Sequence, residues 1–401
     1  MMSPSPEHFV VGDLSDFPLL EGCAYLNHAA ISPPSRQVTA KVKQTLDRFA
    51  RDGSSAFLDV VEERTRLKAR LASILNAPSI DGEDFAWMPN TTSAVQAIAH
   101  AFPWRANGDI VLFDGEFPTN VIPWEQAAKR EGLTLRRASL LPLMRDGGAD
   151  LSEIESLLRR GVQLLAISAV QFQTGLRAPL DELSALCKRY GTSLFLDGIQ
   201  ACGSTPIPLD HVDFMASGGH KWMMAVEGAG FLYVHPKWRG QLKPEQAGWL
   251  SVEEPLDFLF SERSILRYDK PIRNEMSAFE GGAQSALCYA ALEASTRALA
   301  MLTVPVIYNH IQGLLDVLEQ GLLDLGFESA RRSDPSRRSA ILAVRPPEDH
   351  PLKITDYAAS LLEQKITVST PDGWLRFSPH WPNNIEQIHY TLDAIAALHS
   401  S

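Results

Sequence analysis

The chain has 401 residues, of which 45% are hydrophobic and 21% are charged, and its formal net charge is −11 at pH 7. This is the composition of an ordinary globular protein with room for more than one domain, and the acidic balance argues against nucleic acid or an anionic membrane as a partner. Four scattered cysteines without a CxxC pair argue against a disulfide framework, and without a signal pattern or a long apolar run we expect a cytoplasmic protein.

The first half of the chain begins with an irregular pattern and then becomes regular. Residues 1–23 hold three prolines and predict an N-terminal arm. Apolar residues at helical spacing predict helices over 36–49 and 57–75. Short apolar runs then alternate with helical patterns, which is typical of crossover units in a mostly parallel sheet. The predicted strands are 84–88, 110–113, 133–138, 164–170, 194–196, 212–216 and 230–234, and the predicted helices between them are 94–101, 121–131, 150–160 and 179–190.

The pattern changes after residue 236. Residues 237–280 are irregular and rich in charged and aromatic side chains, and we expect them to cover the site. The remaining elements are a helical stretch at 284–325 with a break at 303–305, a strand at 340–344, a helix at 354–364, short strands near 367 and 375, and a helix at 385–398. The sequence therefore predicts an arm (1–23), a large domain (24–280) and a small α+β domain (281–401).

Lys221 and Asp197 follow two of the predicted strands. Asp197 stands directly after the run 194–196, and Lys221 lies just beyond the run 212–216, in the sequence SGGHK. Because ligands of open α/β sheets bind outside the carboxyl ends of the strands, we expect the acid and the amine to face one crevice. A lysine and an aspartate in this relation suit a pyridoxal phosphate site, in which the lysine forms the Schiff base and the carboxylate keeps the pyridine nitrogen protonated.

Read together, the motifs resemble fold-type-I pyridoxal phosphate enzymes, and among them the class V aminotransferase family, which includes cysteine desulfurases, isopenicillin-N epimerase and kynureninase. The resemblance runs from about residue 24 to the last predicted helix and rests most on Asp-x-x-Gln at 197–200 followed by Gly-His-Lys at 219–221. It implies an α/β fold, with a mostly parallel seven-stranded sheet in the large domain and a smaller α+β C-terminal domain. It also implies pyridoxal 5'-phosphate as the cofactor and no metal.

The resemblance assigns roles to four residues around the two strand ends. Lys221 resembles the Schiff-base lysine, which also moves the substrate's α-proton. Asp197 resembles the aspartate that pairs with the pyridinium nitrogen, and its alternative is a helix cap or turn residue. Gln200 resembles the residue that bonds to the phenolic oxygen of the cofactor. His220 resembles the histidine near the cofactor phosphate, and a structural histidine is nearly as good an interpretation.

The stretch NTTS at 90–93 resembles the family's phosphate loop. A helix N-terminus offers free N–H groups and a positive dipole end to a phosphate. Thr91, Thr92 and Ser93 are therefore predicted to bind the cofactor, and simple N-capping is a compatible interpretation.

Two departures concern the same phosphate. Gly218 stands where the family often has a phosphate-binding serine, which leaves Ser217, one position earlier, as the candidate. Ala283 stands where the family brings a threonine to the phosphate of the partner subunit. The role of that segment nevertheless implies a homodimer with its active sites at the interface.

Phe117, in the stretch EFPTN, resembles the aromatic residue that stacks on the cofactor ring. Cysteine desulfurases usually have a histidine there, so this chain keeps the stacking group but lacks a titratable one. A core phenylalanine is an equal alternative. The stretch 170–177 resembles the segment that lies over cofactor and substrate, and we expect Gln171 or Gln173 to reach the site.

Arg376, in the stretch WLRFSPH, resembles the arginine that holds the α-carboxylate of an amino acid substrate. The planar fork of a guanidinium suits a bidentate carboxylate, and the alternative is a structural ion pair. Asn27 and His28 resemble the N-terminal segment that lines the substrate pocket.

The absence of one cysteine reduces the number of reactions that the sequence favours. A desulfurase needs a mobile cysteine shortly before the carboxylate-binding arginine, and residues 366–376 contain none. Because a phenylalanine also replaces the usual histidine, persulfide-forming desulfuration is disfavoured. Transamination, epimerisation and β- or C–S elimination remain open, and the motifs look closest to the epimerase-like branch. A non-catalytic binding protein is the least favoured alternative.

Overall fold

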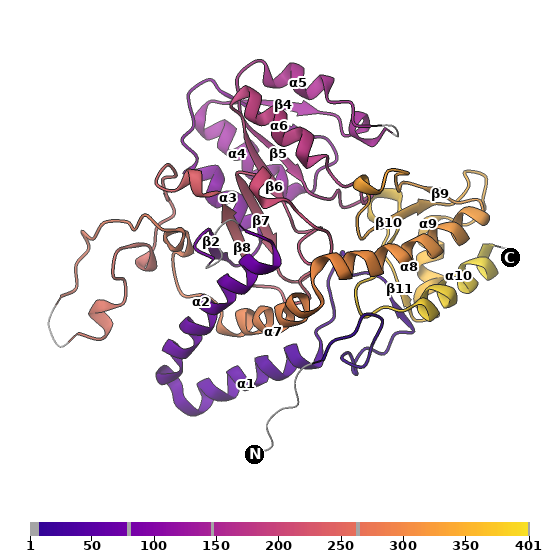
Figure 1. Cartoon of the computed structure of the whole chain (residues 1–401), viewed down its shortest axis with the longest axis horizontal. Helices are drawn as coiled ribbons and strands as arrows, with labels where there is room; N and C mark the ends of the chain where they lie inside the picture. The colour runs from indigo at the N-terminus through magenta and orange to yellow at the C-terminus, as the bar shows by residue number, and fades with distance from the viewer. Residues whose placement is uncertain (1–7, 78–81, 146–147, 262–264, 400–401) are drawn as a thin grey trace.

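The computed structural model describes residues 8–77, 82–145, 148–261 and 265–399. Its centre is a seven-stranded sheet with the strand order β2-β8-β7-β6-β5-β3-β4 (Figure 1). Only β8 runs antiparallel to its neighbours, β2 and β7. The strands are β2 (Phe85–Met88), β3 (Asp109–Phe113), β4 (Thr134–Ala138), β5 (Val162–Ser168), β6 (Ser193–Asp197), β7 (Phe214–Gly218) and β8 (Gly230–Val234). The predicted mostly parallel seven-stranded sheet is confirmed.

The sheet lies between two helical layers because alternate side chains of each strand point to opposite faces. On β6, Phe195 belongs to the hydrophobic cluster that the sheet forms with α3 and α4. Leu194 and Leu196 belong to the cluster on the opposite face, which the sheet forms with the second helical layer. The first layer is α3 (Thr91–Ala101) and α4 (Ile122–Glu131), and the second is α5 (Ser152–Leu158), α6 (Leu180–Tyr190) and α7 (Ala286–Leu302). These strands are apolar on both sides, as expected for a covered parallel sheet.

The helix α7 is followed by a sharp bend of 79° before α8 (Val304–Asp324). Thr303 has a φ of 67° and Pro305 follows in the first turn of α8, so the predicted break at 303–305 is confirmed. Two N-terminal helices, α1 (Arg36–Asp52) and α2 (Phe57–Ile74), pack against α7. Among the described residues, no single helix is long and apolar enough to span a membrane. Only α7 and α8 taken together, as a bent pair, have the length and the apolar composition that a membrane span requires.

The C-terminal part forms a second, smaller layer beside the large sheet (Figure 1). Three antiparallel strands, β9 (Glu328–Ser329), β10 (Leu342–Arg345) and β12 (Leu375–Phe377), are accompanied by α9 (Ile354–Glu363) and α10 (Ile385–His399). The N-terminal β1 (Ala24–Tyr25) pairs in parallel with β11 (Ile366–Thr367). The beginning of the predicted large domain is therefore hydrogen-bonded to the small one.

The described residues of the segment 237–280 do not lie where the sequence analysis expected them. Figure 1 shows most of this segment reaching outward from the β2 side of the sheet, away from the ends of β6 and β7, whereas residues 244–246 and Phe279 line a hollow together with Ser93. Several large apolar side chains on it are exposed, among them Phe258, Phe260 and Tyr268. Within one chain the segment thus does not cover the strand ends that carry Asp197 and Lys221, and that expectation was wrong.

Candidate active site

Asp197 and Lys221 lie at the same edge of the sheet. Asp197 is the last residue of β6, and Lys221 follows the end of β7 by three residues. Burial raises the pKa of Asp197 to about 6, while the Ile199 N–H and the charge of Lys221 oppose the rise. Burial lowers the pKa of Lys221 to about 8, and the charge of Asp197 opposes that fall. A lysine with this pKa is partly neutral near pH 7, as a nucleophilic or basic amine must be.

The carboxylate of Asp197 and the amide of Gln200 each keep a polar atom that the described chain does not satisfy. Asp197 Oδ1 accepts a hydrogen bond from Ile199 N at 3.0 Å, and no partner of Oδ2 is found in residues 8–77, 82–145, 148–261 and 265–399. Gln200 donates from Nε2 to Ala29 O at 3.0 Å and accepts at Oε1 from Trp222 Nε1 at 2.8 Å. One N–H of Gln200 Nε2 therefore remains to donate to a ligand.

The N-terminus of α3 meets the same edge, because β2 runs in the direction of β7. Asn90 caps this helix by accepting Ser93 N at 2.9 Å, so the backbone N–H of Ser93 is occupied. The described chain offers no acceptor to the N–H groups of Thr91 and Thr92. Thr91 Oγ1 is buried without a partner there, and Thr92 Oγ1 lies 2.8 Å from Thr119 Oγ1. Free N–H groups, hydroxyls and the helix dipole together suit a phosphate.

Phe117 lies over Lys221. Its side chain is 45% exposed, and Lys221 Nζ is 5.6 Å from the centre of its ring. Phe172 contacts the ring edge to face, with 5.3 Å between centroids. A phenylalanine this exposed is not a core residue, so its position fits the stacking role.

Arg376 lies on β12 with one nitrogen directed at no protein group that the structure describes. Its Nε donates to Ser369 Oγ at 3.0 Å and its Nη1 to Phe172 O at 2.7 Å, which leaves Nη2. Burial lowers the pKa of the guanidinium to about 10. Since no carboxylate in the described ranges pairs with it, the structural ion pair considered above does not fit, and a carboxylate ligand does.

Comparison with known proteins decides the family. The model described as Aminotransferase class-V matches residues 24–374. The chain belongs to this family. A probable cysteine desulfurase of Chlamydia muridarum (strain MoPn / Nigg) is 33% identical over 198 residues, which are 48% of each protein. The isopenicillin N epimerase of Streptomyces clavuligerus is 33% identical over 162 residues, 40% of this chain and 41% of that one. The matches thus span less than half the length of these curated relatives.

Among solved structures, the cystine C–S lyase C-DES in complex with cysteine persulfide has a TM-score of 0.83 at 22% identity, covering 94% of this chain and 98% of its own. This likeness shows the fold. Another structure of C-DES carries glycine linked covalently to its pyridoxal phosphate. Pyridoxal phosphate is the cofactor of the class-V enzymes, and the unsatisfied atoms of Asp197, Gln200 and Thr91 fit its pyridinium nitrogen, phenolic oxygen and phosphate, respectively.

Ser217 is not placed for the phosphate role assigned to it by sequence. Ala216 packs in the cluster on the α3 side of the sheet and Met215 in the cluster on the other side. Since side chains alternate along β7, Ser217 points away from α3. Its buried hydroxyl donates to Gly218 O at 3.2 Å. The prediction for Ser217 was wrong, and the position that faces α3 is Gly218, which has no side chain.

Gln171 and Gln173 form a hydrogen-bonded chain instead of reaching freely into the site. Gln171 Nε2 donates to Gly115 O at 2.9 Å and to Gln173 Oε1 at 2.7 Å, and its Oε1 accepts from Thr174 N at 2.7 Å. Gln173 Nε2 donates to Asp372 Oδ2 at 2.6 Å. The amide of Gln171 is therefore fully engaged in holding this segment, which does not support its predicted contact with substrate.

Asn27 and His28 differ in what they offer. Asn27 Oδ1 is buried without a partner in the part of the chain that the structure covers, so it fits the predicted pocket role. His28 is 1% exposed, and its Nδ1 lies 2.7 Å from Ser32 Oγ. Its ring contacts those of Tyr25 and His380 at 5.2 and 5.3 Å. The imidazole of His28 is thus surrounded by protein, and its predicted substrate contact has no support in this geometry.

His220 is half-buried beside Lys221, and its backbone oxygen accepts Ser32 N at 2.8 Å. Burial and the charge of Lys221 lower its pKa. A neutral imidazole at this position is compatible with either interpretation given above, so its phosphate role stays a prediction.

Glu116 is a functional candidate that sequence reasoning missed. It is buried directly before Phe117, and it accepts hydrogen bonds from Ser168 N at 2.7 Å, from Ser168 Oγ and from Asn120 Nδ2 at 3.1 Å. Burial raises its pKa to about 7, despite these donors, and the charge of Asp197 adds to the rise. The available signal was a carboxylate placed next to the stacking residue at the end of a buried strand.

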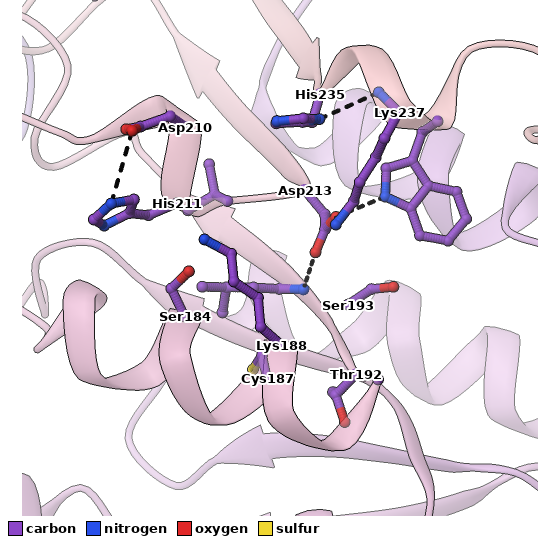
Figure 2. A pocket seen from close by; sticks show the side chains of 14 residues that line it. Ser184, Cys187, Lys188, Thr192, Ser193, Asp210, His211, Asp213, His235 and Lys237 are labelled. Carbon is purple, nitrogen blue, oxygen red and sulfur yellow. Dashed lines mark hydrogen bonds and ion pairs between the residues drawn. The ribbon is translucent and has the colours of Figure 1, made fainter.

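A hollow of about 430 Å³ lies at the opposite end of β6 and β7 (Figure 2). The carboxylate of Asp213 lines the hollow, but protein groups already satisfy its hydrogen-bonding capacity. It accepts hydrogen bonds from Leu194 N at 2.9 Å and from Trp238 Nε1 at 2.7 Å, and it forms an ion pair with Lys237. These bonds fasten the ends of β6, β7 and β8 to one another. The hollow is therefore a structural junction, remote from Lys221.

Proposed function

We propose that this enzyme moves a proton at the α-carbon of an α-amino acid, as transamination and epimerisation require, without a protein persulfide. The observation that carries the proposal is the amine of Lys221, with a pKa of about 8, beside Asp197 and beneath Phe117. Bound at this position, pyridoxal phosphate supplies an electron sink for the α-carbon.

The protein groups divide the remaining tasks. Arg376 binds the α-carboxylate through its unengaged nitrogen and thereby orients the α-carbon. Lys221 Nζ accepts the α-proton and returns it. Asp197 Oδ2 would accept a hydrogen bond from the protonated ring nitrogen, and Phe117 would keep water from one face of the site.

The cysteines give no support to a desulfurase. Residues 366–376, which end at Arg376, contain no cysteine. Cys202 is buried, and burial raises the pKa of its thiol to about 12, so it is not a thiolate at neutral pH. Cys187 is buried in the second helical layer. Cys288 lies on α7 and Cys23 is exposed directly before β1, and neither belongs to the segment that leads to Arg376.

Elimination at a Cβ–S bond is the second candidate. A relative that is 33% identical over about half of this chain is a probable cysteine desulfurase, and removal of the α-proton by a lysine also begins an elimination. The two candidates share Lys221, Asp197 and Arg376 and differ in the bond that breaks afterwards.

The test is to incubate the protein, loaded with pyridoxal phosphate, with a panel of amino acids in D₂O. Exchange of the α-proton should be accompanied by keto acid or by inverted amino acid. Pyruvate and ammonia, formed together with sulfide from cysteine or with cysteine persulfide from cystine, would establish the second candidate. Lys221→Ala should remove the visible absorbance of the loaded protein, and Lys188→Ala on the opposite end of the sheet should not. A protein that takes up no pyridoxal phosphate and exchanges no α-proton would refute both candidates.

We also propose that the chain forms a homodimer with its active sites at the interface. The exposed apolar side chains of the segment 237–280, such as Phe260 (64%) and Tyr268 (94%), favour a covering partner. Sedimentation equilibrium checks this: twice the 44.2 kDa chain mass is expected, and a monomer at micromolar concentration would contradict it.

A further inference from the structure

The backbone around Lys221 is held by two segments that lie far from it in the sequence. His220 O accepts a hydrogen bond from Ser32 N at 2.8 Å, and Lys221 O accepts one from Ser32 Oγ at 2.6 Å. Trp222 O accepts one from His380 Nε2 at 2.8 Å. Three successive carbonyl groups are thus each bonded from outside the large sheet.

The ring nitrogens of His380 have fixed roles. Trp381 N donates to Nδ1 at 2.7 Å, so Nδ1 carries a lone pair and the proton is on Nε2, which donates to Trp222 O. The ring is fully buried, and burial lowers the pKa of His380 to about 4. His380 therefore stays neutral near pH 7, in the tautomer that holds the lysine segment.

The imidazole of His28 orients the hydroxyl of Ser32 by donating a hydrogen bond to it. The hydroxyl has one proton, which it donates to Lys221 O, so the contact of 2.7 Å between His28 Nδ1 and Ser32 Oγ is donated by His28. Burial and the neighbouring His380 hold the pKa of His28 well below its usual range. The side chains of Ser32, His28 and His380 are all buried, and protein groups set the roles of Ser32 Oγ, of His28 Nδ1 and of both ring nitrogens of His380.

The two segments are also bonded to each other and to the segment that carries Arg376. Ser378, two residues after Arg376, donates from N to Leu26 O at 2.8 Å and accepts Ala29 N at its hydroxyl at 3.1 Å. The carbonyl groups around Lys221 and the backbone of Arg376 are consequently attached to one hydrogen-bonded unit.

We propose that Ser32, His28 and His380 are positioning residues for the reaction. They fix the backbone at Lys221 relative to Arg376, so that the lysine amine and the substrate carboxylate keep a constant separation. The proposal rests on the proposed function, in which the amine must take a proton from the α-carbon and return it to the same place.

The physical reason is the length of the lysine side chain. Four methylene groups give the amine many rotamers, and only a fixed backbone limits where the amine comes to rest. Misplacement by about 1 Å costs on the order of 100-fold in rate even when the altered residue does not touch the substrate. Ordinary core packing would need neither the defined tautomers nor three bonds to consecutive carbonyl groups.

The test begins with Ser32→Ala and its matched control Thr192→Val. Thr192 Oγ1 also makes a buried hydroxyl-to-carbonyl bond, to Val162 O at 2.8 Å, at the far end of β6. Both variants should lose similar thermal stability. Only Ser32→Ala should lower kcat by about 10- to 100-fold with KM nearly unchanged, and shift the pH midpoint of the visible band that forms with pyridoxal phosphate alone.

Conservative variants separate positioning from folding. His380→Gln keeps an N–H donor near the place of Nε2, and His28→Asn keeps one near the place of Nδ1, so each should retain most of kcat and the midpoint of the band. His380→Leu and His28→Leu should lose both. Should Ser32→Ala not fold, these pairs carry the comparison.

The outcomes distinguish the two proposals. If the protein forms no band with pyridoxal phosphate, or Lys221→Ala leaves the band unchanged, the proposed function fails. If the band forms and depends on Lys221, but Ser32→Ala and His380→Leu keep the kcat and pH midpoint of the unaltered protein, the positioning proposal is overturned and the proposed function stands.

Discussion

Replacing Glu116 by glutamine tests the charge state of a buried carboxyl group beside the cofactor site. The side chain accepts from Ser168 N at 2.7 Å and from Asn120 Nδ2 at 3.1 Å. Glutamine keeps the first bond but turns an amide nitrogen toward Asn120 Nδ2. Asn120 cannot simply flip, because its Oδ1 accepts from Trp124 Nε1 at 3.1 Å. Two facing donors cost about 1–2 kcal/mol.

The pH dependence follows from the raised pKa. Burial shifts the pKa of Glu116 from 4.5 to about 7. Between these values the folded protein keeps a proton that the unfolded chain has lost. The stability contribution of Glu116 is therefore complete below pH 4.5 and is lost as the pH rises through about 7, a loss of roughly 3 kcal/mol. A glutamine at position 116 does not titrate and has no such loss, so the variant should change from the less stable to the more stable of the two proteins as the pH rises.

We expect Glu116→Gln to be less stable than the unaltered protein by up to about 1 kcal/mol at pH 5 and more stable by about 1–2 kcal/mol at pH 8. Urea unfolding of the cofactor-free protein, followed by tryptophan fluorescence, measures the difference. Glu125→Gln removes a half-exposed carboxylate that pairs with Arg137 at 2.7 Å, and as a control it should change stability by less than about 1 kcal/mol. Parallel curves for the Glu116 variant and the unaltered protein from pH 5 to 8 would refute the reasoning.

Substitutions at three further positions test the ligand contacts. Arg376→Lys should raise KM for the amino acid about 10- to 100-fold, because one ammonium group cannot both hold Phe172 O and bind a carboxylate; steady-state kinetics with an unchanged KM would contradict this. Thr91→Val should leave the melting temperature of the cofactor-free protein equal or higher, since its buried hydroxyl has no partner in the described chain, and weaken cofactor binding about 10-fold in a fluorescence titration. Phe117→Ala should weaken the same binding about 2- to 10-fold, whereas Phe117→His should retain it.

The sequence was sufficient for Asp197 and Lys221 because their placement depends on strand direction alone. Two adjacent parallel strands deliver whatever follows them to one edge, and an error of one or two residues in a strand boundary does not change the edge. The prediction for Ser217 failed because it depended on the boundary itself. The predicted strand ended at residue 216, which left Ser217 in a loop, whereas β7 continues to Gly218. Inside the strand, the alternation of side chains turned Ser217 to the wrong face.

The contacts that Ser32 and His380 make with the segment around Lys221 could not be predicted from the sequence, for a different reason. Ser32 and Lys221 are separated by 189 residues, and His380 and Trp222 by 158. No local periodicity links such pairs, because they meet only after both termini have packed against the large sheet. His28 was placed in the substrate pocket from a motif, while its actual bond to Ser32 depends on this long-range packing.

Residues that contact a ligand differ from residues that support the site in whether their polar atoms are already hydrogen-bonded within the protein. Gln171 uses both ends of its amide within the protein. By contrast, across the residues that the structure describes, Asp197 Oδ2, Arg376 Nη2 and Thr91 Oγ1 have no partner, and Gln200 keeps one N–H. Of these atoms, Thr91 Oγ1 is itself buried, and a buried polar atom left unpaired is costly, so its retention requires a compensating partner. The acceptor at Asp197 suits a protonated ring nitrogen, and the donors elsewhere suit phosphate, phenolate and carboxylate oxygens. This is the charge pattern of pyridoxal phosphate together with an amino acid.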